Sequence, residues 1–193
     1  MGAMLHSMAT TSVSVVLPQL QGSLSATPDQ ISWVITLAVL GAVVATPMSG
    51  WLVDRLGWRA VMLIAIIGFC VSTVLCATAT SLGPMLVYRL FQGAFGAPML
   101  PVAQAILLAT YPINDRAWSQ SAHAVATVLG QAVAPVIGGY FAEAYDWRWT
   151  FIYLIPLSVV AVVMTLAWVP RAGVRRGAKL DWPAFISLAI AIS

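Results

Sequence analysis

The charged side chains of this 193-residue sequence are separated by long stretches that contain none. Nine Lys and Arg and six Asp and Glu residues leave the uncharged stretches 1–28, 30–53, 60–88, 90–114, 117–142 and 149–170. Each is long enough for a helix to cross the hydrocarbon core of a bilayer, which takes roughly 20 residues. The stretches do not alternate polar with apolar residues as barrel strands would, and lipid accepts only helices or closed barrels. The pattern therefore predicts an all-α membrane protein.

The composition excludes other classes of protein. Charged residues make up 8% of the sequence and apolar residues 61%, whereas a soluble domain carries roughly 25% charged residues. A soluble globule could not cover its surface with so few charges, and a disordered chain needs low hydrophobicity. The net charge of +3 forms no basic face or stripe, so we expect no nucleic-acid partner.

The sequence carries no motif of a catalytic or metal site. It contains no HExxH, GxSxG or P-loop motif, and His, Cys and carboxylates do not cluster along it. Cys70 and Cys76 lie in one apolar stretch and form no CxxC pair. We therefore expect neither an enzyme nor a bound metal or cofactor.

Six membrane spans are predicted, near residues 1–20, 31–52, 60–80, 84–109, 118–141 and 149–169. Thr27-Pro28-Asp29-Gln30 fits a capping box with proline in the first turn, and Pro84 can begin the fourth span in the same way. One side of the membrane collects seven Lys and Arg residues from the loops, and the other only Arg148. Because cytoplasmic loops are rich in Lys and Arg, we expect a cytoplasmic N-terminus.

The chain divides into three parts on this interpretation. Residues 1–169 form a six-span bundle, which we expect to consist of two three-helix repeats. Residues 170–181 form a basic cytoplasmic loop, and residues 182–193 begin another apolar helix that is too short to cross the membrane. We therefore expect the N-terminal part of a larger, transporter-sized protein.

Arg89 is the one formal charge within a predicted span. A charge inside the membrane is costly, so it is a candidate functional residue; the alternative is an arginine that extends back to the outer interface. Gln92 and Gly96 follow at helical spacing on the same face. Pro98 and Pro101 then predict a break in this helix, which is tolerated where it packs in protein or lines a cavity.

Small residues recur every four positions along the fifth span, at Ala122, Ala126, Gly130, Ala134 and Gly138. Such a stripe lets another helix backbone approach closely. Pro135 and the Gly138-Gly139 pair predict a bend in the same helix.

Both histidines, His6 and His123, lie in predicted spans. Each is either a satisfied polar group or a proton carrier. His123 is one residue from Ala122, so we expect it to face almost opposite the small-residue stripe.

The connection between the second and third spans is short and charged. Gly50 and Gly57 enclose Asp54 and Arg55, and Arg59 follows. It is either a topology anchor or a latch in which Asp54 and Arg59 form an ion pair against a neighbouring helix end.

Taken together, these segments resemble the major facilitator superfamily, and more closely its drug:proton antiporters with fourteen spans, the EmrB/QacA type. Three motifs carry the resemblance: Gly50-x-Leu52-x-Asp54-Arg55-x-Gly57-x-Arg59 in the loop, Leu86-x-x-Arg89-x-x-Gln92-Gly93 in the fourth span, and Gly130-x-x-x-Ala134-Pro135-x-x-Gly138-Gly139 in the fifth. The last resembles an antiporter signature, with Ala134 where glycine is usual.

The resemblance implies the N-terminal six-helix bundle of this superfamily plus the start of a seventh span, and two bundles that rock about a central cavity. It implies a conformational latch at Asp54 and Arg59 and a role for Arg89 in proton coupling. A bend that favours export would form at Gly130, Pro135, Gly138 and Gly139.

The sequence departs from this family in its first span. Members commonly carry an aspartate there, in a segment ending Ala-Leu-Pro, but this segment ends Val16-Leu17-Pro18 and Ala9 stands at the aspartate position. The proton step would then use His6 or Arg89, carboxylates outside this chain, or a different coupling. Gln92 and His123 are further candidates. Because a buried carboxylate is the natural partner of a cationic drug, we expect neutral or anionic amphipathic substrates.

The resemblance thus implies a secondary transporter of a bacterial inner membrane, a proton-coupled multidrug exporter that works by alternating access. Its partners would be a small hydrophobic or amphipathic substrate, protons and the lipid bilayer; family members can also dock a periplasmic adaptor protein. The alternatives are an uptake symporter for a small metabolite and a non-transporting membrane scaffold or sensor. The segment from Gly130 to Gly139 argues against the symporter, and Arg89 and Asp54 argue against the scaffold.

Overall fold

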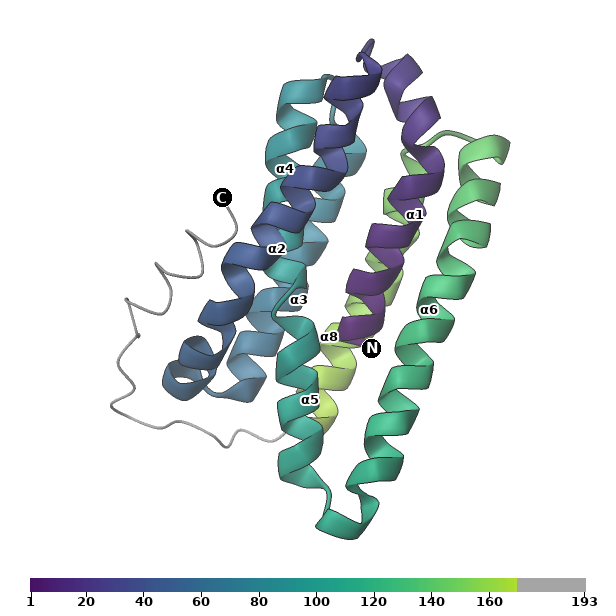
Figure 1. The fold of residues 1–193 in the computed structure, drawn as a ribbon. Coiled ribbons are helices and arrows are strands. Elements are labelled where there is room, and N and C mark those ends of the chain that lie inside the picture. The colour runs from purple at the N-terminus through teal and green to yellow at the C-terminus, as the bar shows by residue number, and fades with distance from the viewer. Residues whose placement is uncertain (170–193) are drawn as a thin grey trace.

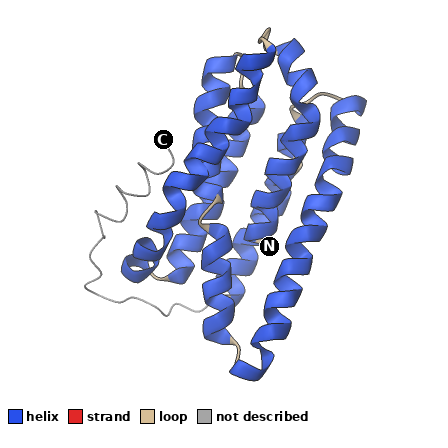
Figure 2. Cartoon of the chain, in the orientation of Figure 1, coloured by secondary structure: helices blue, strands red, loops and turns tan. Residues whose placement is uncertain are grey.

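The structure, a computed structural model, describes residues 1–169, which form a bundle of helices joined by short connections (Figures 1 and 2). The helices are α1 (Gly2–Ser23), α2 (Pro28–Leu56), α3 (Trp58–Thr78), α4 (Leu82–Gly96), α5 (Met99–Thr110), the short 3₁₀ helix η1 (Ile113–Asp115), α6 (Arg116–Ala144), α7 (Trp149–Ile152) and α8 (Leu154–Trp168). The predicted all-α architecture is confirmed. The predicted loop 170–181 and helix start 182–193 lie outside the described residues.

Five helical segments are long and apolar enough to cross a membrane: Pro28–Leu56, Trp58–Thr78, Leu82–Thr110, Ile113–Ala144 and Trp149–Trp168. They match the second to sixth predicted spans. The first predicted span is helical, as α1, but it is more polar than the others. Its Thr10, Thr11 and Ser14 hydroxyls donate to backbone carbonyls one turn earlier, so these polar groups are satisfied within the helix.

The start of α2 follows the predicted capping box. Thr27 Oγ1 accepts a hydrogen bond from Gln30 N at 3.3 Å, and Gln30 Oε1 accepts one from Thr27 N at 3.1 Å. Pro28 occupies the first turn, where its missing N–H is not needed.

The predicted loop between the second and third spans is almost entirely helical, which corrects the sequence-based boundary. Helix α2 continues through Gly50, Asp54 and Arg55 to Leu56, and Gly57 alone connects it to α3. Gly57 has φ 81°, a conformation that glycine adopts without strain. No proline or further glycine follows Gly50 before Gly57, so nothing stops the helix earlier.

The predicted break in the fourth span is confirmed. Helix α4 ends at Gly96 and α5 begins at Met99. Pro98 cannot donate a backbone hydrogen bond to Ala94, and its ring opposes a continuous helix. Pro101 lies in the first turn of α5, where proline is tolerated.

Two helix pairs hold the bundle together through close backbone contact. Helix α2 packs along α4, and α1 packs along α6 (Figure 1). A Cβ atom on Gly93 would overlap the carbonyl group of Ala38, and one on Gly41 would overlap the carbonyl of Leu90. Only glycine permits this approach between α2 and α4.

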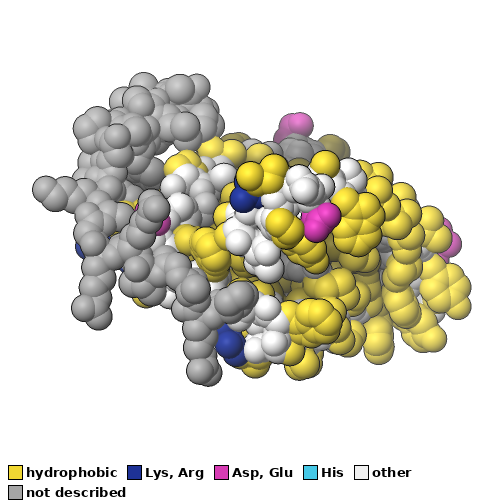
Figure 3. All heavy atoms as spheres, turned by 90° about the horizontal axis from the view of Figure 1, so that it is seen from below, with side chains coloured by type: hydrophobic (Ala, Val, Ile, Leu, Met, Phe, Trp, Pro, Cys, Tyr) yellow, Lys and Arg dark blue, Asp and Glu magenta, His cyan; other side chains and the backbone are white. Residues whose placement is uncertain are grey.

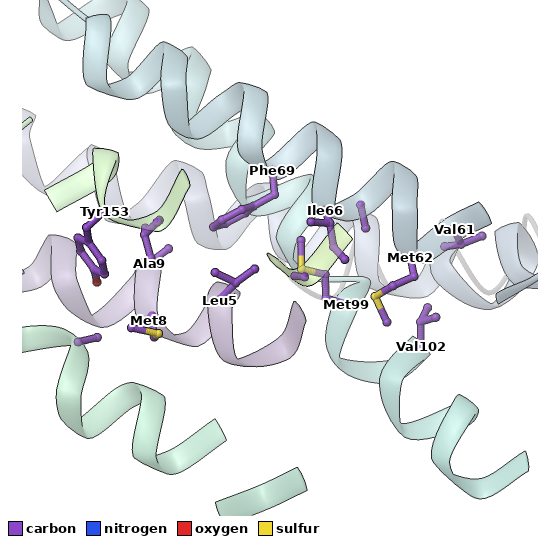
Figure 4. Packing of buried hydrophobic residues seen from close by; sticks show 14 residues of the cluster. Leu5, Met8, Ala9, Val61, Met62, Ile66, Phe69, Met99, Val102 and Tyr153 are labelled. Atoms are coloured by element: carbon purple, nitrogen blue, oxygen red, sulfur yellow. The ribbon is translucent and has the colours of Figure 1, made fainter. Parts of the chain in front are cut away.

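The interior between these pairs is apolar. One cluster gathers side chains of α1, α3 and α5, among them Leu5, Phe69 and Met99 (Figure 4). Apolar side chains also cover much of the surface seen in Figure 3, as expected where lipid replaces water as the solvent.

Candidate functional site

Arg89 lies inside the bundle, in the middle of α4, with 2% of its surface exposed. Its Nε donates a hydrogen bond to the carbonyl oxygen of Val34 in α2 at 3.3 Å. Its Nη1 donates to Oε1 of Gln92, one turn further along α4. The guanidinium is therefore held within the protein and does not extend back to the interface.

Gln92 extends this polar network to a third helix. Its Nε2 donates to Thr73 Oγ1 of α3 at 2.7 Å, and Thr73 donates in turn to the Phe69 carbonyl at 2.7 Å. Gln92 is 2% exposed and Thr73 is fully buried. Because α2, α3 and α4 each contribute a partner, the network fixes these helices relative to one another.

His6 lies on α1 next to this network. A Cβ atom on Gly96 would overlap Nδ1 of His6, so the imidazole ring packs directly on the α4 backbone where that helix ends. His6, Ala9, Arg89 and Gln92 are among the residues that line a cavity of about 10 Å³. This is about the smallest cavity volume that can hold one water molecule.

The expectation that His123 faces away from the small-residue stripe is wrong. The buried positions of α6 are Ser119, Gly130, Ala134, Gly138 and Ala142, while Ala122 and Ala126 are exposed and His123 is half-buried. A helix has 3.6 residues per turn, so each step of four rotates a stripe by about 40°. The packed face therefore passes to His123 and leaves the two alanines outside.

His123 and Met1 line a different cavity from the one that Arg89 lines. This cavity has a volume of about 340 Å³, and Met62, Ile106 and Trp168 also line it. The Nε2 atom of His123 is buried and has no hydrogen-bond partner among residues 1–169.

The part of α6 around Pro135, where the sequence predicts a bend, packs against α1 and α7. Ser12 of α1 donates to the Ala134 carbonyl at 3.1 Å and lies 2.5 Å from the Tyr153 hydroxyl. Thr150 donates to the Gly138 carbonyl at 3.2 Å. Side chains on two other elements thus bind the backbone on both sides of Pro135.

The charged residues around Gly57 do not form the expected ion pair. Within residues 1–169 the one ion pair is Arg148 with Asp146, at 3.7 Å. Arg59 instead donates from Nη2 to the carbonyl oxygen of Leu166 at 2.6 Å, near the C-terminal end of α8, where a cation is favourable. Arg55 stacks on Trp51, 4.6 Å from the ring centre.

Sequence analysis missed four polar residues of these contacts: Ser12, Thr73, Thr150 and Tyr153. Serine, threonine and tyrosine are common in membrane helices, and their positions follow no pattern that distinguishes them. Their partners lie on other helices, so only the packed structure identifies them. Among the described residues, no three His, Cys, Asp or Glu side chains are close enough to hold a metal ion.

Comparison with known proteins places this arrangement in a family. A family model described as Major Facilitator Superfamily matches residues 1–191. The chain is 30% identical over 157 residues to the multidrug export protein EmrB of Escherichia coli, which covers 81% of the chain and 31% of EmrB. It is 31% identical over 156 residues to the fatty acid resistance protein FarB of Neisseria gonorrhoeae, with the same shares covered.

The fold is similar to that of a solved transporter. The inward-open structure of the xylose transporter XylE from E. coli superposes with a TM-score of 0.76 at 17% identity, over 99% of this chain and 54% of XylE. At this identity the likeness shows the fold alone. The matched region spans about a third of the length of EmrB and FarB.

Proposed function

Because the chain belongs to the Major Facilitator Superfamily, we propose that it forms the N-terminal bundle of a proton-driven exporter of hydrophobic compounds. Residues 1–169 would be one of two bundles that move against each other by alternating access. The bundle would lie in the inner membrane with its N-terminus in the cytoplasm. This orientation places the helix ends that carry Arg55, Arg59 and Arg116 on the cytoplasmic side, where Lys and Arg are enriched.

The observation that carries the proposal is the buried Arg89 network. A passive membrane scaffold has no need for a guanidinium in its interior, and removing such a charge from water is expensive. Arg89 and Gln92 join three helices through hydrogen bonds. We assign them to proton coupling, in which a change of charge nearby alters the helix contacts.

The composition of helix α6 supports export over uptake. Gly130, Pro135, Gly138 and Gly139 lie on a helix whose small residues pack on α1. The name of the relative EmrB, a multidrug export protein, points the same way. In the proposal this segment sets the curvature of α6 and thereby favours the export cycle.

The residues near Gly57 form the proposed conformational latch. Arg59 binds the α8 backbone, while Asp54 is half-buried at the end of α2, and Gly50, Arg55 and Gly57 complete the motif. In the proposal, Asp54 and Arg59 change partners when the two bundles move.

The proposed substrates are neutral or anionic amphipathic molecules. No Asp or Glu is buried within residues 1–169, so this bundle offers a cationic drug no carboxylate partner inside the membrane. The relative FarB is named for resistance to fatty acids, which are anionic amphiphiles. A periplasmic adaptor protein remains a proposed partner of the whole protein.

The test uses the full-length protein in proteoliposomes with an imposed proton gradient. We expect transport of a fatty acid or a neutral amphiphile in preference to a quaternary ammonium dye, and loss of that transport in Arg89→Gln. The exposed Arg116→Gln is the matched control and should retain it. Preference for the dye would overturn the substrate class, and gradient-driven transport by Arg89→Gln would overturn the role of Arg89.

A further inference from the structure

His6 is placed where a change of its charge would act directly on Arg89. The two side chains line the same cavity of about 10 Å³, together with Thr10 and Gln92. Their side chains carry an imidazole, a hydroxyl, a guanidinium and an amide, although most of the surface of the cavity is apolar. The imidazole and the guanidinium therefore share an apolar setting, in which a charge on one acts strongly on the other.

We propose that His6 is the proton-binding residue of this bundle and that Arg89 responds to its charge. The imidazole nitrogen accepts a proton from a hydronium ion to form imidazolium and water, and later returns the proton to water. One N–H bond forms as one O–H bond breaks, and the reverse happens on release. Imidazolium and guanidinium repel each other within one apolar cavity. This inference rests on the proposed function and names the residue that carries its proton.

Hydrogen bonds of Arg89 and Gln92 would transmit the effect of this repulsion to two other helices. Arg89 donates to Val34 of α2, and its partner Gln92 donates to Thr73 of α3. Helix α1 itself packs mainly along α6. A proton on α1 thus changes the contact between the α1–α6 pair and the helices α2, α3 and α4 within this bundle.

Among residues 1–169, Arg89 and His6 are the groups with ionisable side chains that line this cavity. The Met1 amino group lies five residues before His6, and α3, whose Phe69 lines the cavity, carries Arg59, Cys70 and Cys76. Tyr153 binds Ser12, which is about 9 Å further along α1. His123 lies beside Met1 in a separate cavity. The remaining groups of α2, α4 and α6 lie toward their helix ends or on α4 one residue before Arg89: Asp29, Asp54, Arg55, Tyr88, Arg116, Tyr140 and Glu143. Helices α5, α7 and α8 carry none. Arg89 is therefore the charge that shares a cavity with His6.

The experiment compares His6→Gln, His6→Glu and the control His123→Gln in the full-length protein in proteoliposomes. Two activities are measured over a range of pH: accumulation driven by a proton gradient, and exchange of substrate across the membrane without a gradient. His6→Gln should abolish driven accumulation and retain exchange within about threefold of wild type. His123→Gln should retain both activities.

His6→Glu restores a titratable group at the same position. We expect driven accumulation to return with a changed pH profile, because a carboxyl group and an imidazole beside the same guanidinium do not titrate at the same pH. A misfolded variant would lose exchange as well as accumulation, so exchange reports folding. Driven accumulation by His6→Gln with an unchanged pH profile, or its loss only in His123→Gln, would overturn the proposal.

Failure of the proposed function gives a different result. If wild type accumulates no compound of the substrate panel, the exporter proposal fails, whatever the variants do. His6 is then tested directly by nuclear magnetic resonance of ring-labelled histidine in nanodiscs. The resonance that disappears in His6→Gln should shift with pH; a resonance that does not shift between pH 4 and pH 9 overturns the assignment of His6.

Discussion

At the scale of single residues, the buried hydrogen-bond network makes the side chains of Arg89, Gln92 and Thr73 depend on one another for partners. Each side chain of this buried series has its polar group matched by the next, ending at the Phe69 carbonyl. In a low-dielectric interior such a network is stable when complete and costly when one member is missing. Removal of any one of these side chains therefore leaves a buried polar group on its neighbour without a hydrogen-bond partner.

Thr73→Val tests this dependence. Valine keeps the shape of threonine but leaves Gln92 Nε2 without an acceptor, so we expect the free energy of unfolding to fall by about 1–3 kcal/mol. Denaturant titration of the full-length protein in detergent measures the change. The control is Ser72→Ala: Ser72 is also buried, but it bonds only to Gly68 in its own helix. Equal losses in both variants would contradict the network.

The buried polar residues of α4 could be predicted from the sequence, but their hydrogen-bond partners on other helices could not. Arg89 stands out in the sequence because charge is rare in a membrane span, and Gln92 follows it at helical spacing. Thr73 is separated from Gln92 by 19 positions, and no local pattern indicates which hydroxyl on which helix will face an amide. The sequence identified the buried charge, and the packing supplied its partners.

At the scale of helices, contact between α2 and α4 depends on the absence of side chains. Gly93→Ala would force a methyl group into the Ala38 carbonyl, and overpacking of this kind costs roughly 1–3 kcal/mol or more. We expect poor expression or a clearly lower thermal midpoint of the full-length protein. Gly83→Ala, at a position of α4 with open space around it, should change stability little.

The segment of α6 around Pro135 accepts hydrogen bonds from Ser12 of α1 and Thr150 of α7. Tyr153→Phe removes the hydroxyl that lies against Ser12, which should lower the free energy of unfolding by about 1 kcal/mol. Backbone hydrogen exchange around Pro135 should also increase. Tyr140→Phe is the control, since Tyr140 is 66% exposed. Unchanged exchange in Tyr153→Phe would show that this segment of α6 is stable without this contact.

The helices themselves were largely predictable, and the exceptions have physical causes. Capping residues and prolines act locally, so the start of α2 and the break at Pro98 follow from the sequence. The end of α2 was placed too early because charge suggested a loop, although charged residues are compatible with a helix end at the interface. The orientation of His123 was wrong because the stripe rotates gradually around α6.

At the scale of the whole molecule, the connections alternate between the two ends of the bundle. Gly57 and η1 lie at one end, and residues 79–81 and 145–148 lie at the other (Figure 1). The distribution of Arg in these connections assigns the first end to the cytoplasm. The alternation follows from spans separated by short connections and was predicted; the contacts between spans were not.

Labelling of single cysteines tests this topology. In the full-length protein with Cys70 and Cys76 replaced by alanine, Asp115→Cys should react with a membrane-impermeant maleimide only from the cytoplasmic side. Asp146→Cys, on an exposed position at the other end, should react only from outside. Reaction of both from the same side would exclude the bundle as a membrane-spanning unit.

The single-residue connection at Gly57 leaves no slack between two long helices. Helix α3 starts directly where α2 ends, and Arg59 ties that start to the backbone of α8. A tilt of α2 therefore cannot be absorbed by a loop and must be transmitted to two further helices. The cytoplasmic end of this bundle would then move as one rigid unit. Bending within the bundle would occur instead at the break between α4 and α5.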